Sequence, residues 1–302
     1  MWMRIIISGK NTYNFIKNTI FAPKFRKMIQ QLNFSGRLSS LERPLIMGIL
    51  NITEDSFYDG GKYLSEQAII ERAGQMLAEG ADIIDVGAMS TRPGAADIPE
   101  QIEKENIKNG VRAIKTRYPS VPVSIDTWRS SVAEIALEYG ADMINDVSGG
   151  TFDLDMISVV ASAQVPYCLM HSPEKPDIMQ NCTNYDDILV EMLQFFGDQL
   201  EKLHIANVHD IIIDPGFGFG KTLEQNYFLL KNLDAFKIFN LPILVGVSRK
   251  SMIYKLLNTN PQGALNGTSI VNTYALLHGA NILRVHDVKA AAEVRAICEQ
   301  LS

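Results

Sequence analysis

Two groups of side chains in the sequence suit chemistry on a charged heterocyclic substrate. Asp126, Asn145 and Asp214 offer carboxylate and amide acceptors, and the Asn145 amide adds donors. Such a set suits the edge of a flat ring with adjacent N–H and NH₂ donors, in a site walled by Met170 and Phe219. The second group is cationic and suits an anionic leaving or anchoring group. Its members are Arg92, Lys250, Arg284 and His286.

The segment 214–222, DPGFGFGKT, approaches the pattern of a phosphate-binding loop but departs from it at one position. That loop needs a glycine, four residues and then Gly-Lys-Ser/Thr, so that backbone N–H groups curl around phosphates. Counting back from Gly220 places the first glycine at Pro215, which has no N–H. We therefore expect a tight turn that brings Phe219 to a site, with Asp214 as its functional residue. We expect Lys221 to cap the turn or to face solvent.

Short apolar, β-branched runs recur from residue 44 onward and predict eight β-strands. Each run is followed by a loop with Gly, Asp or Asn and then by a stretch with helical periodicity. The predicted strands are 44–50, 82–87, 121–125, 142–145, 165–170, 210–213, 242–247 and 281–285.

Amphipathic stretches between these runs predict eight helices. In residues 65–80, the apolar Ile69, Ala73 and Met76 recur at three- and four-residue spacing. Ser65 is the expected N-cap, and Gly80 is expected just past the C-terminus. The predicted helices are 65–80, 99–118, 129–139, 153–163, 185–206, 223–236, 263–279 and 288–301.

Eight evenly spaced strand–helix units predict an α/β fold of the (β/α)₈ TIM-barrel type, with a short N-terminal extension. A doubly wound sheet also alternates strand and helix, but it does not need eight units. Active-site residues of a barrel gather at the carboxyl ends of the strands. Every predicted strand is followed there by a polar or charged group. These groups are Asn51, Ser90 to Arg92, Asp126, Asn145 with Asp146, His171, Asp214, Ser248 to Lys250, and Arg284 to Asp287.

Seven segments in this order resemble the dihydropteroate synthase family and span residues 48–289. The resemblance implies a TIM-barrel pterin-binding catalytic domain over residues 41–302. It leaves residues 1–40 as a basic N-terminal extension that includes a candidate barrel-closing segment. The segments are GILNITEDSFYDGG (48–61), STRPGA (90–95), SIDT (124–127), MINDVSGG (143–150), DPGFGFGKT (214–222), GVSRKS (246–251) and RVHDVK (284–289).

This resemblance implies an enzyme of folate biosynthesis, a transferase that joins p-aminobenzoate to 6-hydroxymethyl-7,8-dihydropterin diphosphate and releases pyrophosphate. It assigns the pterin to Asp126, Asn145, Met170, Asp214, Phe219, Lys250 and Arg284. It assigns the diphosphate to Asn51, Arg92, Arg284 and His286, with Mg²⁺ shared between Asn51 and the substrate. It assigns p-aminobenzoate to Thr91, Arg92, Pro93, Phe219, Lys250 and Ser251. The catalytic residues it implies are Asp126, Lys250, Arg284 and His286.

The implied reaction needs no nucleophilic Ser or Cys, and the sequence offers no such arrangement above chance. The bond from the methylene carbon to the diphosphate must break, so Arg284, His286 and Mg²⁺ would stabilise charge on the leaving group. The dihydropterin can delocalise the positive charge left on the methylene, which favours an SN1-like path. The resemblance also implies a homodimer and inhibition by sulfonamides, which mimic p-aminobenzoate in this family.

The sequence departs from the family pattern at three loop positions. Glu54 replaces the usual Pro, and Ala88 and Met89 replace a common Gly-Glu pair. These changes affect the two loops expected to close over the substrates, not the pterin set. His171 lies in a divergent segment and is left without a role, since a satisfied buried histidine is an equal alternative. Of the loop acids, Asp55 is favoured for function and Asp59 for a turn.

The charge distribution argues against nucleic acid as a partner. The chain of 302 residues has a net charge of −6, but residues 1–40 contain seven basic and no acidic residues. Removing those seven charges leaves −13 for residues 41–302. A plain extension with Met28 as the working start is favoured for the basic segment over an organelle transit peptide, and both readings stay open.

Three scattered cysteines and the lack of a long apolar run predict a cytoplasmic protein without a disulfide framework or a membrane span. Three other functions are considered. A methyltetrahydrofolate methyltransferase shares the pterin set but has no use for STRPGA or SRKS. A Schiff-base aldolase would use Lys250 as its nucleophile. A pterin-binding paralogue would lack turnover.

Overall fold

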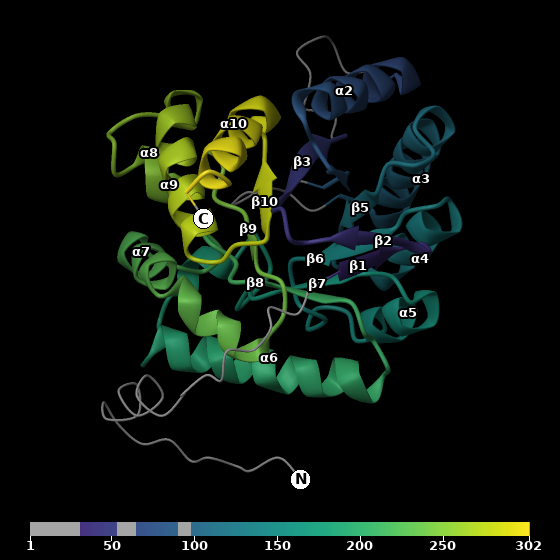
Figure 1. Cartoon of the computed structure of the whole chain (residues 1–302). Coiled ribbons are helices and arrows are strands. Elements are labelled where there is room, and N and C mark those ends of the chain that lie inside the picture. Colours follow the sequence, from purple (N-terminus) through teal and green to yellow (C-terminus); the bar gives the residue numbers. More distant parts are fainter. Residues whose placement is uncertain (1–30, 53–64, 90–97, 302) are drawn as a thin grey trace.

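Eight parallel strands form a nearly closed barrel in the computed structural model, which describes residues 31–52, 65–89 and 98–301 (Figure 1). The hydrogen-bonded order is β8-β7-β6-β5-β4-β3-β10-β9, and one parallel bridge between Ile213 and Ile243 joins the two ends. The predicted (β/α)₈ fold is confirmed. The strands are β3 (Leu45–Asn51), β4 (Ile83–Gly87), β5 (Val123–Asp126), β6 (Met143–Asp146), β7 (Tyr167–Met170), β8 (Ile211–Asp214), β9 (Leu244–Val245) and β10 (Ile282–Val285).

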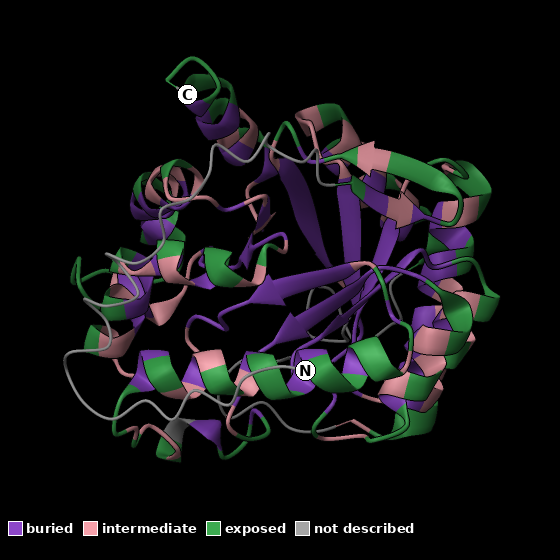
Figure 2. Ribbon diagram, turned by 60° about the horizontal axis from the view of Figure 1, so that its bottom comes forward, coloured by how far each residue is buried: buried purple, intermediate pink, exposed green. Residues whose placement is uncertain are grey.

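Helices surround the barrel, with their buried stripes toward the sheet and their exposed stripes outward (Figure 2). The predicted caps of α2 are present: the Ser65 hydroxyl accepts from the Ala68 N–H, and Gly80 has a φ of 104°. The main helices are α2 (Glu66–Glu79), α3 (Glu100–Arg117), α4 (Ser130–Glu138), α5 (Met156–Ala163), α6 (Ile188–Ile205), α7 (Leu223–Lys231), α9 (Leu265–Leu277) and α10 (Val288–Cys298). Shorter pieces are α8 (Ser251–Tyr254), η2 (Met179–Asn181), η3 (Leu233–Phe239) and η4 (Gln262–Ala264).

Two predicted helices differ in extent from the structure. The range 223–236 is not one helix, because α7 ends at a C-cap residue, Asn232, and a 3₁₀ segment follows. The range 153–163 becomes helical only at Met156. Asp153 instead accepts a hydrogen bond from the Ser130 N–H at the start of α4, at 2.7 Å. Its side chain therefore satisfies a free N–H of the neighbouring helix.

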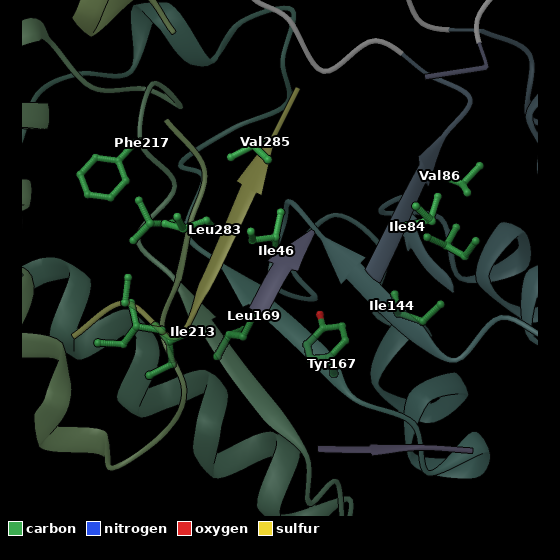
Figure 3. Packing of buried hydrophobic residues seen from close by; sticks show 14 of the residues in the cluster. Ile46, Ile84, Val86, Ile144, Tyr167, Leu169, Ile213, Phe217, Leu283 and Val285 are labelled. Atoms are coloured by element: carbon green, nitrogen blue, oxygen red, sulfur yellow. The ribbon is translucent and has the colours of Figure 1, made fainter. Parts of the chain in front are cut away.

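Alternation along the strands separates the core into an outer and an inner layer. Ile46, Ile84 and Ile144 project outward into the layer between sheet and helices (Figure 3). Met47 follows Ile46 in β3, and Ile83 precedes Ile84 in β4. Both side chains therefore point inward and pack in a different cluster, at the amino end of the barrel interior. Because side chains of a strand alternate between faces, the next inward positions lie nearer the carboxyl end.

A hairpin of β1 (Gln31–Phe34) and β2 (Arg37–Ser40) lies within the basic extension and was not predicted as strands. Leu32 and Phe34 are each 1% exposed and pack in the inner cluster with Met47. The Asn33 N–H donates to the Asp210 carboxylate at 3.0 Å. These contacts cover the amino end of the barrel.

We predict that Phe34→Ala lowers the free energy of unfolding by about 3–5 kcal/mol, since it leaves a cavity under the barrel. Urea denaturation measures this change. Leu38→Ala is the matched control, because Leu38 belongs to the same hairpin and is 68% exposed. Equal denaturation midpoints for the two variants would show that the hairpin does not contribute to the core.

Candidate active site

The inward positions at the carboxyl end of the barrel are polar and buried. Asp85, Asp126, Asn145 and Asp214 are each no more than 5% exposed, and Arg284 reaches in from β10 with 14% of its side chain exposed. Four strands supply the first four residues, one from each of β4, β5, β6 and β8. The barrel therefore brings together the acceptor set predicted from the strand ends and adds one carboxylate to it.

Arg284 holds two of these carboxylates at once. Its Nε donates to Asp85 Oδ2 at 2.6 Å, and its Nη2 donates to Asp126 Oδ2 at 2.5 Å. Burial opposes the charge of the guanidinium, but Asp85 and Asp126 outweigh burial and raise the pKa of Arg284 above its ordinary value. Arg284 thus stays charged at the centre of the site.

Asp85 is a site residue that was missed in the sequence. It lies in the middle of β4, whereas the predicted site residues come from the ends of the strands. Besides Arg284, it accepts a hydrogen bond from Asn145 Nδ2 at 3.2 Å. The signal that could have found it is period-two alternation, which places an acid on the same inward face as Ile83 and Gly87.

Asp126 and Asp214 keep acceptor capacity for a ligand. Asp126 Oδ1 is buried without a hydrogen-bond partner, and Asp214 Oδ1 accepts from the Gly216 N–H at 2.8 Å. Burial raises the pKa of Asp126 to about 7 against the lowering effect of Arg284, and burial also raises the pKa of Asp214. A ligand edge that donates hydrogen bonds would satisfy the free acceptor.

Lys250 completes the site from the loop after β9. Its Nζ donates to the Phe217 carbonyl at 2.5 Å and lies 4.6 Å from the centre of the Phe219 ring. Burial lowers the pKa of Lys250 to about 8, although Asp214 counteracts it. Ser251 begins α8 directly after this lysine. Phe219 belongs to a buried apolar cluster with Met170, Met89, Trp128, Val147 and Met179.

Asn51 and His286 lie at the ends of neighbouring strands, β3 and β10. A Cβ at Gly87 would lie 3.7 Å from both Asn51 Oδ1 and Asp126 Oδ2, so both side chains approach the space above that glycine. The Ser248 hydroxyl lies 3.1 Å from both the backbone N and the Nδ1 of His286. Ser248 thus orients the imidazole at the rim.

Known proteins are similar to this chain in sequence and in fold. A model of the pterin binding enzyme family matches residues 47–286. A dihydropteroate synthase of Synechocystis sp. is 43% identical over 263 residues, which cover 86% of this chain and 91% of that protein. The Yersinia pestis dihydropteroate synthase, solved with a sulfonamide drug complex, superposes with a TM-score of 0.85 at 39% identity, covering 90% of this chain and 99% of that one.

This chain belongs to the dihydropteroate synthase family. The predicted family, fold and enzyme activity are confirmed. Another solved member, from Thermus thermophilus in complex with 4-aminobenzoate, has a TM-score of 0.81 and 37% identity, and the match covers 90% of this chain and 100% of that one.

Several predicted residues of the dihydropteroate synthase site are not tested by the structure. Thr91, Arg92 and Pro93 lie outside the described residues, as do Glu54, Asp55 and Asp59. At the ends of β6, β9 and β10, other polar groups bind partners within the protein. Arg249 forms a two-contact ion pair with Asp287, at 2.7 and 2.8 Å. Asp146 accepts from the Tyr167 hydroxyl at 2.7 Å and does not join the site.

Of the two alternatives predicted for Lys221, capping the turn is confirmed and exposure to solvent is wrong. Lys221 is 4% exposed, and its Nζ contacts His171 and two carbonyl oxygens of its own loop. His171 is also buried, and burial lowers its pKa well below the ordinary value. The prediction of a tight turn is confirmed, because Gly216, Gly218 and Gly220 all have positive φ.

We predict that Asp126→Asn flattens the pH dependence of stability in the unliganded protein. Since burial raises the pKa of Asp126 from 3.8 to about 7, the folded chain keeps a proton that the unfolded chain releases in this window. The contribution of this group therefore falls as the pH rises from 3.8 to about 7. Urea denaturation across that range measures the slope. The exposed Asp155→Asn serves as control, and an unchanged slope in Asp126→Asn would contradict the prediction.

Proposed function

We propose that this chain condenses p-aminobenzoate with 6-hydroxymethyl-7,8-dihydropterin diphosphate through the buried site at the carboxyl end of its barrel. One observation supports this use of the site most directly. Within the part of the chain that the structure describes, Asp126 Oδ1 is a buried acceptor without a partner beside Asn145 and Asp214, while Arg284 and Lys250 supply positive charge in the same buried cluster. A ring with a donor edge and an anionic substituent complements both features.

In this proposal, three polar side chains bind the edge of the pterin and two buried side chains cover its faces. The acceptors of Asp126, Asn145 and Asp214 receive the N–H and NH₂ donors of the ring. Met170 and Phe219 are both buried and cover its faces. Arg284, whose guanidinium is fixed by two carboxylates, packs over the ring, and Lys250 reaches it from the loop after the neighbouring strand β9.

The diphosphate lies at the rim of the site. Arg284 and His286 neutralise it together with Asn51 and Arg92, which brings cationic groups to the oxygen that will carry the new charge. Ser248 limits the rotation of the His286 imidazole, since it contacts both the ring and the backbone of that residue. Ser248 therefore holds the imidazole at the rim, where the leaving group is proposed to lie.

A Mg²⁺ ion fits this arrangement through Asn51. In the described residues, no group of three or more His, Cys, Asp or Glu side chains is placed to hold a metal. Mg²⁺ needs few protein ligands when phosphates and water complete its shell, and the Asn51 carboxamide oxygen is of the type it prefers. When bound, the ion would supply Lewis-acid stabilisation of the diphosphate.

The reaction breaks the bond between the methylene carbon and the diphosphate oxygen, and its electron pair leaves with pyrophosphate. The positive charge on the methylene spreads into the dihydropterin ring, where Asp126 and Asp214 lie close enough to favour it. The aryl amine of p-aminobenzoate then attacks the methylene carbon and releases one proton. Arg284 and His286 act mainly on the departing diphosphate, and Lys250 on the ring and the incoming amine.

The p-aminobenzoate lies on the side of Lys250 and Phe219 in this proposal. Ser251, at the start of α8, borders its pocket, and Thr91, Arg92 and Pro93 would close over it. The related Thermus thermophilus protein, solved in complex with 4-aminobenzoate, supports this class of second substrate. The phenyl ring of Phe219 offers an apolar face to the aromatic ring of p-aminobenzoate, and the Lys250 ammonium lies beside that face.

A homodimer is also proposed, formed through α9. This helix exposes the large apolar side chains of Leu265, Ile270 and Leu277. Ile270 and Leu277 lie seven residues apart on one side of it and are 61% and 51% exposed, and Ile297 of the adjacent α10 is exposed as well. A second copy of the chain would cover this surface. None of the three cysteines forms a disulfide within the described residues, which is compatible with the proposed cytoplasmic setting. No described helix is long and apolar enough to cross a membrane.

We predict that the chain releases pyrophosphate only with both substrates and Mg²⁺ present, and that His286→Ala lowers this turnover by about 10²–10³-fold. The dihydropterin Kd of this variant should change by less than about 3-fold, because the ring edge is untouched. A coupled pyrophosphate assay and calorimetry measure the two quantities. Asp214→Ala is the contrast, since it should lose pterin affinity. Equal losses of turnover and affinity in His286→Ala would contradict the leaving-group role.

We predict that Ile270→Glu converts the dimer into a monomer, because a charge on the proposed contact face would be buried without a partner. Light scattering after size-exclusion chromatography gives the mass. Leu154→Glu is the control at a site that is 81% exposed and lies before α5. A wild-type mass equal to that of one chain would refute the proposed dimer.

A further inference from the structure

The Lys221 ammonium lies in a cage of acceptors inside the protein. Its Nζ donates to the carbonyl oxygens of Gly216 and Phe219, each at 2.9 Å, and lies 3.1 Å from His171 Nδ1. The His171 carbonyl is a further acceptor at 3.3 Å. Because an ammonium carries three N–H donors, these partners occupy all of them. Lys221 therefore binds its own chain and has no donor left for a substrate.

The glycines of the loop explain why acceptors converge on this lysine. Gly216, Gly218 and Gly220 have φ values of 67°, 82° and 56°. A Cβ at Gly216 would lie 2.1 Å from the His171 carbonyl oxygen, so the loop backbone packs directly on the end of β7. A phosphate loop turns N–H groups inward around an anion. Here the glycine-rich turn directs carbonyl groups around a cation that the chain itself supplies.

The loop that Lys221 fixes carries both contacts of Lys250 described above. The Phe217 carbonyl accepts from Lys250 Nζ, and the Phe219 ring lies beneath the same ammonium. Gly218 also packs on the Lys250 side chain, since a Cβ there would lie 3.2 Å from its Cδ. All three positions fall within the turn whose ends Lys221 binds. A shift of this turn would move every partner of Lys250 on that side together.

We propose that Lys221 is a positioning residue for the p-aminobenzoate side of the site, acting through Phe217 and Phe219 on Lys250. This inference rests on the function proposed above. Asp126 and the other acceptors for the pterin edge are held by strands of the barrel. The pterin shares only Phe219 and Lys250 with this loop and keeps its edge contacts on the strands, so its binding depends less on Lys221 than p-aminobenzoate binding does.

Lys221→Met tests this role, because methionine keeps most of the side-chain length and removes the charge and its donors. The KM for p-aminobenzoate should rise about 10- to 100-fold, as expected when a contact group is displaced by about 1 Å, while the dihydropterin Kd changes less than about 3-fold. Hydrogen exchange of the amides in residues 214–222, followed by mass spectrometry, should become faster. This second readout does not depend on turnover.

Lys115→Met is the matched control. Lys115 is also largely buried, with 15% of its side chain exposed, and it binds Asp142 and the Val121 carbonyl before β5, away from the active site. Its substitution should lower the melting temperature without a selective change for either substrate. Asn226→Ala is a second test of the loop, because Asn226 Oδ1 accepts from the Gly218 N–H at 2.7 Å. It should raise the KM for p-aminobenzoate selectively, and it decides the question if Lys221→Met does not fold.

Equal changes for both substrates, or wild-type KM and exchange rates, in Lys221→Met would overturn the positioning role. The same results in Asn226→Ala would overturn it where only that variant folds. Failure of the wild-type chain to release pyrophosphate would instead contradict the proposed function. In that case unchanged exchange in residues 214–222 would still overturn the placement of the loop by Lys221, and faster exchange would support it.

Discussion

The balance of charge inside the carboxyl end of the barrel constrains every other feature of the site. Asp85, Asp126 and Asp214 face two cations, Arg284 and Lys250, in a volume that excludes most water. An isolated ion in such an interior costs several kcal/mol, so each group must be held by a partner. Burial raises the pKa of Asp126 although Arg284 opposes it, and the nearby Asp85 carboxylate adds to the rise. The acceptor left free by this arrangement is what a ligand with a donor edge can recognise.

Much of the fold could be predicted because the relevant interactions are local in sequence. The strands are short apolar runs, and the caps of α2 lie within a few residues of the helix they end. Asp126 and Asp214 are the final residues of their strands, and Asn145 is the next to last in its strand. A search of strand ends therefore finds them, and the barrel geometry then requires that they converge.

The other features of the fold and the site could not be predicted, because they depend on contacts between residues far apart in the chain. Asp85 becomes a site residue only through Arg284, 199 positions later, and Asn145, 60 positions later. The burial of Lys221 depends on the φ values of three glycines and on His171, which is 50 positions earlier. In the β1–β2 hairpin only Leu32 and Phe34 are buried apolar residues, so the segment has little apolar pattern, and its core cluster includes strands far along the chain.

The strand pairing between β8 and β9 is the weakest in the barrel wall. Every other neighbouring pair in the described sheet forms a ladder, whereas this pair is joined by a single bridge at Ile213 and Ile243. Beyond the carboxyl ends of these strands, the Lys250 side chain after β9 donates to the Phe217 carbonyl after β8, so a side chain joins the two segments. The wall can thus widen at this place with little loss of strand pairing.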